Sequence, residues 1–271
     1  MKTLFRTAEG AFVRDGAEVF ALGPITDSEL ADAVARLSPA LIGLESAAGV
    51  PRLPVTPTRI VLVGLNYASH AAEIGAPAPT QLMFGAVPAA AAAPHGSEVS
   101  RPPSAPDQVD YEGEVGIVIG RAAANVSPAE AAGVVLGLTP VIDVSARDLQ
   151  VAALAAKDQG PTIAESKSFP NFKPFGPEIL LTEGRPLEGF DLSLETRVNG
   201  ETRQRGRTSE LIFSLAEVVS TISRKIPLQA GDLICSGTPA GVGFASKRFL
   251  QAGDRVEVTL ETLPTLSITL A

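Results

Sequence analysis

The sequence predicts a strand-rich α+β protein, with a small N-terminal α/β unit followed by a larger domain. Short β-branched and apolar runs such as residues 60–63 recur along the chain, whereas few stretches show the spacing of an amphipathic helix. A proline-rich segment, residues 50–57, separates the first part from the rest, because closely spaced prolines favour extended chain over helix or inner strand.

The N-terminal unit is expected to contain three strands and one helix. A capping box of Thr26 and Glu29 predicts a helix that runs to about residue 37. We place the domain boundary in the proline-rich segment, which gives a small domain, 1–52, and a catalytic domain, 53–271. The three strand-like pieces lie at residues 4–6, 11–13 and 19–22, with a turn at 14–16.

The larger domain carries most of the predicted strands. Apolar and polar residues alternate over 192–198, as in a strand. Asn199-Gly200 follows directly and is a strong signal for a hairpin turn. Apolar residues at helical spacing predict a helix over 210–223, and Ser145 with Asp148 predicts the start of another that runs to about residue 156. The other strands are expected at 60–63, 109–119 and 134–144.

Composition excludes several classes of protein. The chain has 271 residues and a net charge of −8, so we expect no nucleic-acid partner. No apolar run approaches the roughly 20 residues of a membrane-spanning helix, so we expect no membrane partner either. A single cysteine, Cys235, excludes an internal disulfide and a thiolate zinc cage. Charged residues at Lys2 and Arg6 leave no room for the apolar run of a secretory leader near Met1, which favours a cytoplasmic protein.

A cluster of carboxylates is the strongest chemical signal. Asp110, Glu112 and Glu114 open an apolar segment, and residues two apart on a strand face the same side. A divalent cation would offset their repulsion, although a solvated strand edge is the alternative. Asp143 ends another apolar run, where a ligand or a plain turn residue is expected. With only two histidines, carboxylates must supply the ligands, which favours Mg²⁺, Mn²⁺ or Ca²⁺.

A second signal is a histidine beside an acid. His70 and Glu73 are three residues apart, so they meet on one helical face, as an oriented general base requires. A surface histidine with a chance neighbour is the alternative. Lys167 is a charge stabiliser or a solvated lysine. The glycine-rich residues 237–243 lack the ending of a phosphate loop and predict a tight turn, in which Thr238 could touch a ligand.

Together these motifs resemble the fumarylacetoacetate hydrolase superfamily, from about residue 59 to 270. Their order and spacing carry the resemblance. The motifs are Gly64-Leu65-Asn66-Tyr67 with His70 and Glu73; Asp110-Tyr111-Glu112-Gly113-Glu114; Asp143-Val144-Ser145-Ala146-Arg147-Asp148-Leu149-Gln150; Lys167-Ser168-Phe169 with Pro174-Phe175-Gly176-Pro177; Asn199-Gly200-Glu201 with Gln204; and Gly231-Asp232 with Gly237-Thr238-Pro239-Ala240-Gly241-Val242-Gly243.

The resemblance implies a mixed β-roll catalytic domain, a homodimer, and a site with assigned roles. It implies a catalytic dyad, His70 with Glu73, on a lid, and Lys167 stabilising negative charge. It implies that Mg²⁺ or Mn²⁺ is held by Glu112, Glu114 and Asp143. Gln150 and Thr238 would line the substrate pocket.

The activity implied is metal-dependent hydrolysis of a carbon–carbon bond in a small β-diketo or 2-oxo acid, of the acylpyruvate or fumarylacetoacetate type. His70 would activate water, and the departing carbon would leave as an enolate on the metal. Decarboxylation, isomerisation and hydration at the same metal site are the alternatives. Relatives commonly carry a lysine two residues after the equivalent of Phe84, where this chain has Ala86. That departure supports a further alternative, a non-catalytic subunit that binds a small acid.

Overall fold

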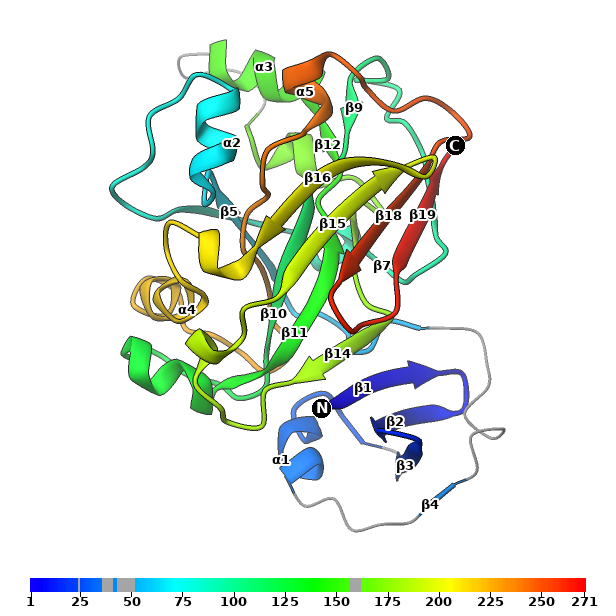
Figure 1. The fold of residues 1–271 in the computed structure, drawn as a ribbon, viewed down its shortest axis with the longest axis vertical. Coiled ribbons are helices and arrows are strands. Elements are labelled where there is room, and N and C mark those ends of the chain that lie inside the picture. The colour runs from blue at the N-terminus through cyan, green and yellow to red at the C-terminus, as the bar shows by residue number, and fades with distance from the viewer. Residues whose placement is uncertain (24, 36–40, 43–51, 156–161) are drawn as a thin grey trace.

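The computed structural model describes residues 1–23, 25–35, 41–42, 52–155 and 162–271, and it confirms a strand-rich α+β fold (Figure 1). A ten-stranded mixed sheet has the order β4-β3-β2-β1-β14-β11-β10-β17-β5-β6. Its strands are β1 (Lys2–Thr7), β2 (Gly10–Asp15), β3 (Glu18–Gly23), β4 (Leu41–Ile42), β5 (Ile60–Gly64), β6 (Met83–Val87), β10 (Gly113–Ile119), β11 (Val135–Ile142), β14 (Glu178–Leu181) and β17 (Leu233–Cys235).

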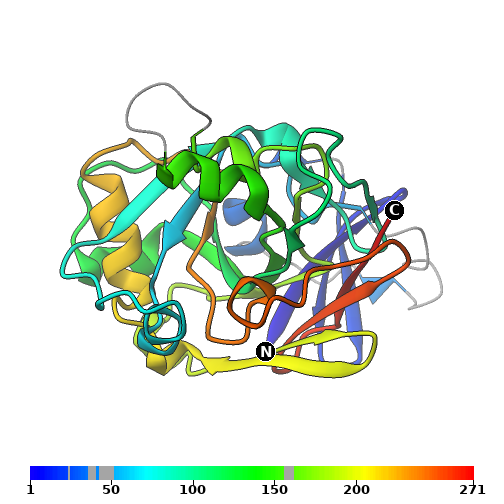
Figure 2. The same ribbon diagram turned by 90° about the horizontal axis from the view of Figure 1, so that it is seen from above.

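A second, five-stranded sheet of order β16-β15-β18-β19-β8 packs against β10 and β11 (Figures 1 and 2). Two short pairs, β12–β9 and β13–β7, complete the strands. The remaining strands are β7 (Ala92–Ala93), β8 (Glu98–Val99), β9 (Val109–Asp110), β12 (Ser145–Ala146), β13 (Lys173–Pro174), β15 (Ser193–Val198), β16 (Glu201–Arg207), β18 (Arg255–Leu260) and β19 (Leu266–Leu270). The helices are α1 (Leu30–Ala35), α2 (Ala68–Glu73), α3 (Arg147–Ala155), α4 (Leu215–Ser223) and α5 (Gly243–Ser246).

The N-terminal strands form as expected and extend the large sheet. β1 pairs antiparallel with β2 on one side and with β14 on the other. Leu4 and Val13 share one core cluster with Leu136 and Ile179 of the larger domain. The division at 52/53 stays a prediction, and the expected end of the first helix at 37 lies outside the described residues.

The predicted strand over 109–119 is interrupted, which corrects one expectation about the carboxylates. β9 pairs with β12, whereas β10 pairs with β11 and β17, and Tyr111 and Glu112 lie between them. The Asp110 carboxylate accepts the Tyr111 N–H at 2.8 Å, a local bond that competes with strand pairing. Asp110 is therefore on a different strand from Glu114, although Arg147 bonds both Asp110 and Glu112.

Two helix starts also differ from expectation. Ser145 is not a cap: it lies in β12, and α3 begins at Arg147. The predicted helix over 210–223 begins only at Leu215, because Ser214 and Glu217 form a capping box that fixes its first turn. The hairpin signal is confirmed: Asn199 and Gly200 join β15 to β16 with φ of 52° and 79°.

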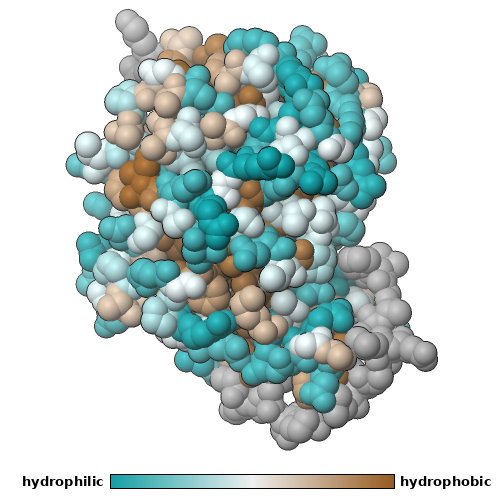
Figure 3. All heavy atoms as spheres, in the orientation of Figure 1, coloured by the Kyte–Doolittle hydropathy of each residue, from teal (hydrophilic) through white to brown (hydrophobic). Residues whose placement is uncertain are grey.

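The core explains where polar groups can gather. β10 and β11 are buried along their whole length. Val115 and Ile117 pack in a cluster that includes α4 and the second sheet, while Val118 packs toward β1 and β14. The face drawn in Figure 3 mixes hydrophilic residues with scattered hydrophobic ones. Among the described residues, no helix is long and apolar enough to cross a membrane.

Candidate active site

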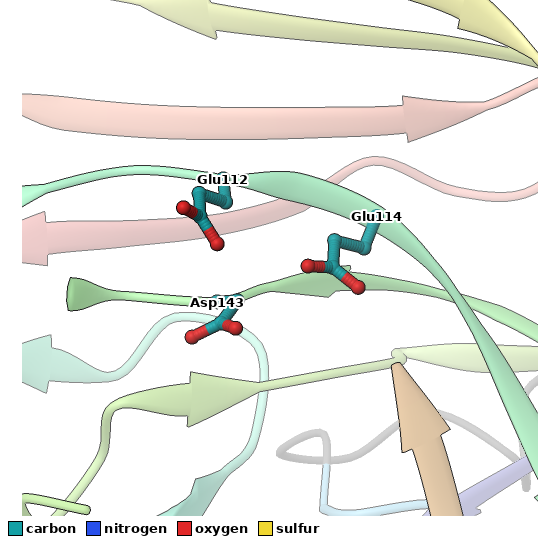
Figure 4. A group of neighbouring side chains, drawn as sticks. All are labelled: Glu112, Glu114 and Asp143. Carbon is teal, nitrogen blue, oxygen red and sulfur yellow. The ribbon is translucent and has the colours of Figure 1, made fainter. Parts of the chain in front are cut away.

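Three buried carboxylates converge where β10 begins and β11 ends. The pairing places Gly113 opposite Ile142, and the Asp143 N–H donates to the Glu112 carbonyl at 2.8 Å. One side-chain oxygen each of Glu112, Glu114 and Asp143 lies within 4.8 Å of the other two, and Figure 4 shows the three side chains as neighbours. The structure therefore brings the three predicted ligands together.

The pKa values of the two glutamates in this triad are shifted in opposite directions. Burial raises the pKa of Glu114 well above its ordinary value, and the carboxylates of Asp143 and Glu112 raise it further. Burial would also raise the pKa of Glu112, but Lys167, Arg147 and His70 outweigh burial and hold that pKa below its ordinary range. Glu114 is thus the carboxylate of the triad that most lacks positive charge.

Lys167 is part of this cluster and is buried, so it is not a solvated lysine. It ends a 3-10 turn, Glu165–Lys167. Its Nζ donates to Glu112 at 2.6 Å, to Asp143 at 2.8 Å and to the Ser145 hydroxyl at 2.8 Å. Burial would lower the pKa of Lys167, yet Asp143 and Glu112 raise it above its ordinary value, so the lysine is a fixed positive charge.

Sequence reasoning missed two further buried cations. Arg147 Nε donates to Asp110 at 2.8 Å, and another guanidinium nitrogen donates to Glu112 at 2.6 Å. Lys173 is fully buried, with Nζ 2.7 Å from Asp143 Oδ1. The available signal for Lys173 was a lone charge inside the apolar run from Phe172 to Phe175.

The donor set fits a divalent cation. The described cluster holds four carboxylates (Asp110, Glu112, Glu114 and Asp143) and three cations (Arg147, Lys167 and Lys173), so negative charge is in excess. Asp143 Oδ1 is buried and forms an ion pair with Lys173 Nζ at 2.7 Å, but it accepts from no other described group, which leaves it a lone pair for a metal ion. Carboxylate oxygens with unused lone pairs are the ligands that Mg²⁺, Mn²⁺ and Ca²⁺ prefer.

The His–Glu pair forms on α2 as predicted. His70 Nδ1 lies 2.7 Å from Glu73 Oε1, and the other oxygen, Oε2, accepts the Gly241 N–H at 2.8 Å. His70 is only 7% exposed, so it is not a surface histidine. With Nδ1–H directed at the carboxylate, Nε2 is the nitrogen that can accept a proton. The arrangement is that of an oriented general base.

The glycine-rich loop has a role that its sequence did not reveal. Backbone N–H groups of Gly237, Gly241 and Gly243 donate to Glu114, Glu73 and Asp110 at 2.7, 2.8 and 2.7 Å. A Cβ at Gly241, where φ is +109°, would lie 1.9 Å from the Arg203 carbonyl oxygen. Residues 237–242 form an irregular loop with a bend at Ala240, and not the predicted tight turn. The loop ties the triad to the His–Glu pair.

The two predicted substrate-binding residues lie in different surroundings. Thr238 is buried, and its hydroxyl donates to the Gly113 carbonyl at 2.8 Å and accepts from Gln204 at 2.7 Å. Gln150 lies half-buried on α3, and its side-chain oxygen accepts from Arg147. Their roles toward a substrate stay predictions.

Fold and site together define the class: a mixed-sheet α+β protein with a buried acidic cluster beside a His–Glu base. The family model for the C-terminal domain of fumarylacetoacetate (FAA) hydrolase matches residues 59–271. The chain belongs to this family of enzymes.

Named relatives carry several activities. The chain is 37% identical over 219 residues to the oxaloacetate tautomerase YisK of Bacillus subtilis, covering 79% of this chain and 70% of that one. It resembles a 5-carboxymethyl-2-hydroxymuconate delta-isomerase from Mycobacterium smegmatis (TM-score 0.76, 32% identity, 100% and 98% of the two chains). It also resembles a fumarylacetoacetate hydrolase from Exiguobacterium antarcticum (TM-score 0.81, 28% identity, 100% and 99%).

Proposed function

We propose that this protein is a divalent-cation-dependent enzyme that acts on a small 2-oxo acid, with His70 as its base. The carboxylate triad next to an oriented His70–Glu73 pair supports the proposal. Glu112, Glu114 and Asp143 would hold Mg²⁺ or Mn²⁺. When bound, the ion would act as a Lewis acid on adjacent substrate oxygens.

The chain's own residues then move the proton. Glu73, held by Gly241, keeps the imidazole in one orientation, and Nε2 of His70 takes the proton. The positive charge of Lys167 stabilises negative charge that develops on the substrate. Gln150, whose side-chain oxygen accepts from Arg147, would line the substrate pocket.

Keto–enol isomerisation is the first candidate reaction. His70 removes a proton from the carbon beside the carbonyl, and the proton returns to another atom of the substrate, so no water is consumed. The printed activities of two similar proteins, a tautomerase and an isomerase, favour it.

Hydrolysis of a carbon–carbon bond, which the sequence analysis favoured, is the second candidate. There His70 takes the proton from water, the hydroxide attacks a carbonyl, and the departing carbon is protonated. The likeness to a fumarylacetoacetate hydrolase favours it. Both reactions use the same base, so the substrate distinguishes them.

The test compares three substrate reactions with Mg²⁺ present and after chelation: enol–keto conversion of oxaloacetate, cleavage of an acylpyruvate, and decarboxylation of oxaloacetate. We expect enol–keto conversion to be fastest and His70→Ala to slow it by about 10²–10⁴-fold. His95→Ala is the matched control, because His95 accepts the Ser267 N–H and belongs to neither the carboxylate triad nor the His70–Glu73 pair. Faster acylpyruvate cleavage would establish the hydrolase. Absence of cation-dependent turnover, with oxalate still bound, would favour the non-catalytic subunit.

We also propose that the protein is a cytoplasmic homodimer, as the family resemblance implies. Light scattering at micromolar concentration tests the assembly, and a monomeric mass would contradict it.

A further inference from the structure

Lys173 is a fully buried cation of the acidic cluster. It lies on β13, which pairs with β7, and its side chain is 0% exposed. Its Nζ donates to the carbonyls of Val144 and Phe172, each at 3.0 Å, and lies over the Phe172 ring. Because it is enclosed on these sides, the ammonium group is not placed to meet a substrate.

The energetics of burial explain what Lys173 needs. A buried ammonium group is costly unless an opposite charge compensates it. Asp143 supplies that charge, with Oδ1 at 2.7 Å from Lys173, while its other oxygen meets Lys167 at 2.8 Å. The carboxylate of Asp143 is thus flanked by two cations before any metal is considered.

Lys167 and Lys173 differ in what they can do. Lys167 bonds two triad carboxylates and a hydroxyl, as a group in the reacting site would. Lys173 pairs with Asp143 alone among the described carboxylates, and Asp143 Oδ1 accepts from no other described group, which leaves it a further lone pair. A metal ion can still bind that oxygen, but it must do so next to the ammonium group of Lys173.

We propose that Lys173 is a built-in counter-cation of the acidic site, one that keeps the triad assembled in the metal-free protein and lowers its affinity for the divalent cation. The inference rests on the cation site proposed above. It makes Lys173 a positioning residue that acts through Asp143, not a catalytic one.

The experiment measures Mn²⁺ binding by electron paramagnetic resonance and metal-free melting temperature in EDTA. Lys173→Met removes the charge and keeps the length of the side chain. We expect it to bind Mn²⁺ at least about tenfold more tightly than the wild type, because like charges a few ångströms apart repel strongly in a buried site. We expect its metal-free melting temperature to fall, and Mn²⁺ to restore more of it than in the wild type.

Arg59→Met is the matched control. Arg59 pairs with Asp232, which is as fully buried as Asp143 but pairs outside the triad. This variant should lose stability in EDTA as well, yet bind Mn²⁺ with wild-type affinity. Lys173→Arg, which retains the charge, should also bind Mn²⁺ as the wild type does.

The possible outcomes separate this inference from the proposed function. Wild-type Mn²⁺ affinity in Lys173→Met would overturn the inference and leave the cation site standing. Absence of Mn²⁺ binding in both the wild type and Lys173→Met would contradict the proposed cation site and this inference together. Lys173→Gln is prepared with Mn²⁺ as a second neutral variant. If neither neutral variant folds even with Mn²⁺, the inference is wrong, since the ion should replace the missing charge.

Discussion

Asp110 and Glu114 are both buried acids, four positions apart in the chain, yet their surroundings are opposite. Asp110 accepts backbone N–H groups from Tyr111, Gly243 and Phe244 at 2.7–2.8 Å, and Arg147 Nε at 2.8 Å. Its charge is compensated by fixed donors from three parts of the chain.

Glu114 has no comparable set of donors. The Gly237 N–H is its one hydrogen bond among the described residues, and Asp143 and Glu112 repel it. Burial alone therefore does not separate structural acids from reactive ones. What separates them is whether the surrounding donors satisfy the charge, because an unsatisfied buried carboxylate favours a proton or a cation.

The largest expected effect comes from neutralising the unsatisfied acid. Glu114→Gln should lower cation-dependent turnover by at least about a thousandfold, because Lewis-acid catalysis contributes several kcal/mol. Its metal-free stability should not fall, since one of three repelling charges is gone. Turnover of oxaloacetate and urea denaturation in EDTA check this. Near-normal turnover would show that the triad does not hold the catalytic ion.

Removing Asp110, whose charge is satisfied by fixed donors, should instead lower the stability of the metal-free protein. Asp110→Ala leaves Arg147 buried with one carboxylate fewer, and breaking such a pair costs about 3–5 kcal/mol of stability. Urea denaturation in EDTA measures the loss, with Glu114→Gln as the comparison. Equal stability of the two variants would contradict the distinction drawn between these acids.

A smaller effect is expected from displacing the glycine-rich loop, residues 237–243. Its N–H groups donate to Glu114, Glu73 and Asp110. Gly241→Ala places a Cβ against the Arg203 carbonyl and shifts the N–H that fixes Glu73. We expect turnover to fall about 10²-fold, as an ångström-scale displacement of a catalytic group can do. Gly253→Ala is the control: φ is +87° there, but no atom lies within 4 Å of the new Cβ. If both variants retain full activity, the loop does not position the base.

The smallest expected effect is a change of metal-free stability with pH. The pKa of Glu114 is raised in the folded protein, so the folded state binds more protons than the unfolded state above the ordinary value of 4.5. Metal-free stability should therefore fall as pH rises from that value through the raised pKa, by at most about 1.4 kcal/mol per pH unit. Melting in EDTA from pH 5 to 8 measures the slope. Glu114→Gln should flatten it, and an unchanged slope would assign it to another group.

The sequence alone determined those features that depend on near neighbours. Short apolar runs specified several strands, among them β1, β2, β3 and β5, and Asn199-Gly200 specified a hairpin, because both are set by local backbone preference. His70 and Glu73 meet because one helical turn separates them. Ordered motifs were sufficient to identify the family.

Only the tertiary structure decided which charges share the site. Asp110 lies on β9, apart from Glu114 on β10, and Arg147 joins Asp110 to Glu112 from more than 30 positions along the chain. Lys173 entered the cluster from a segment 30 positions beyond Asp143, and Gly237 reaches Glu114 across 123 positions. Such contacts depend on the register and packing of strands far apart in the chain, which local periodicity does not specify.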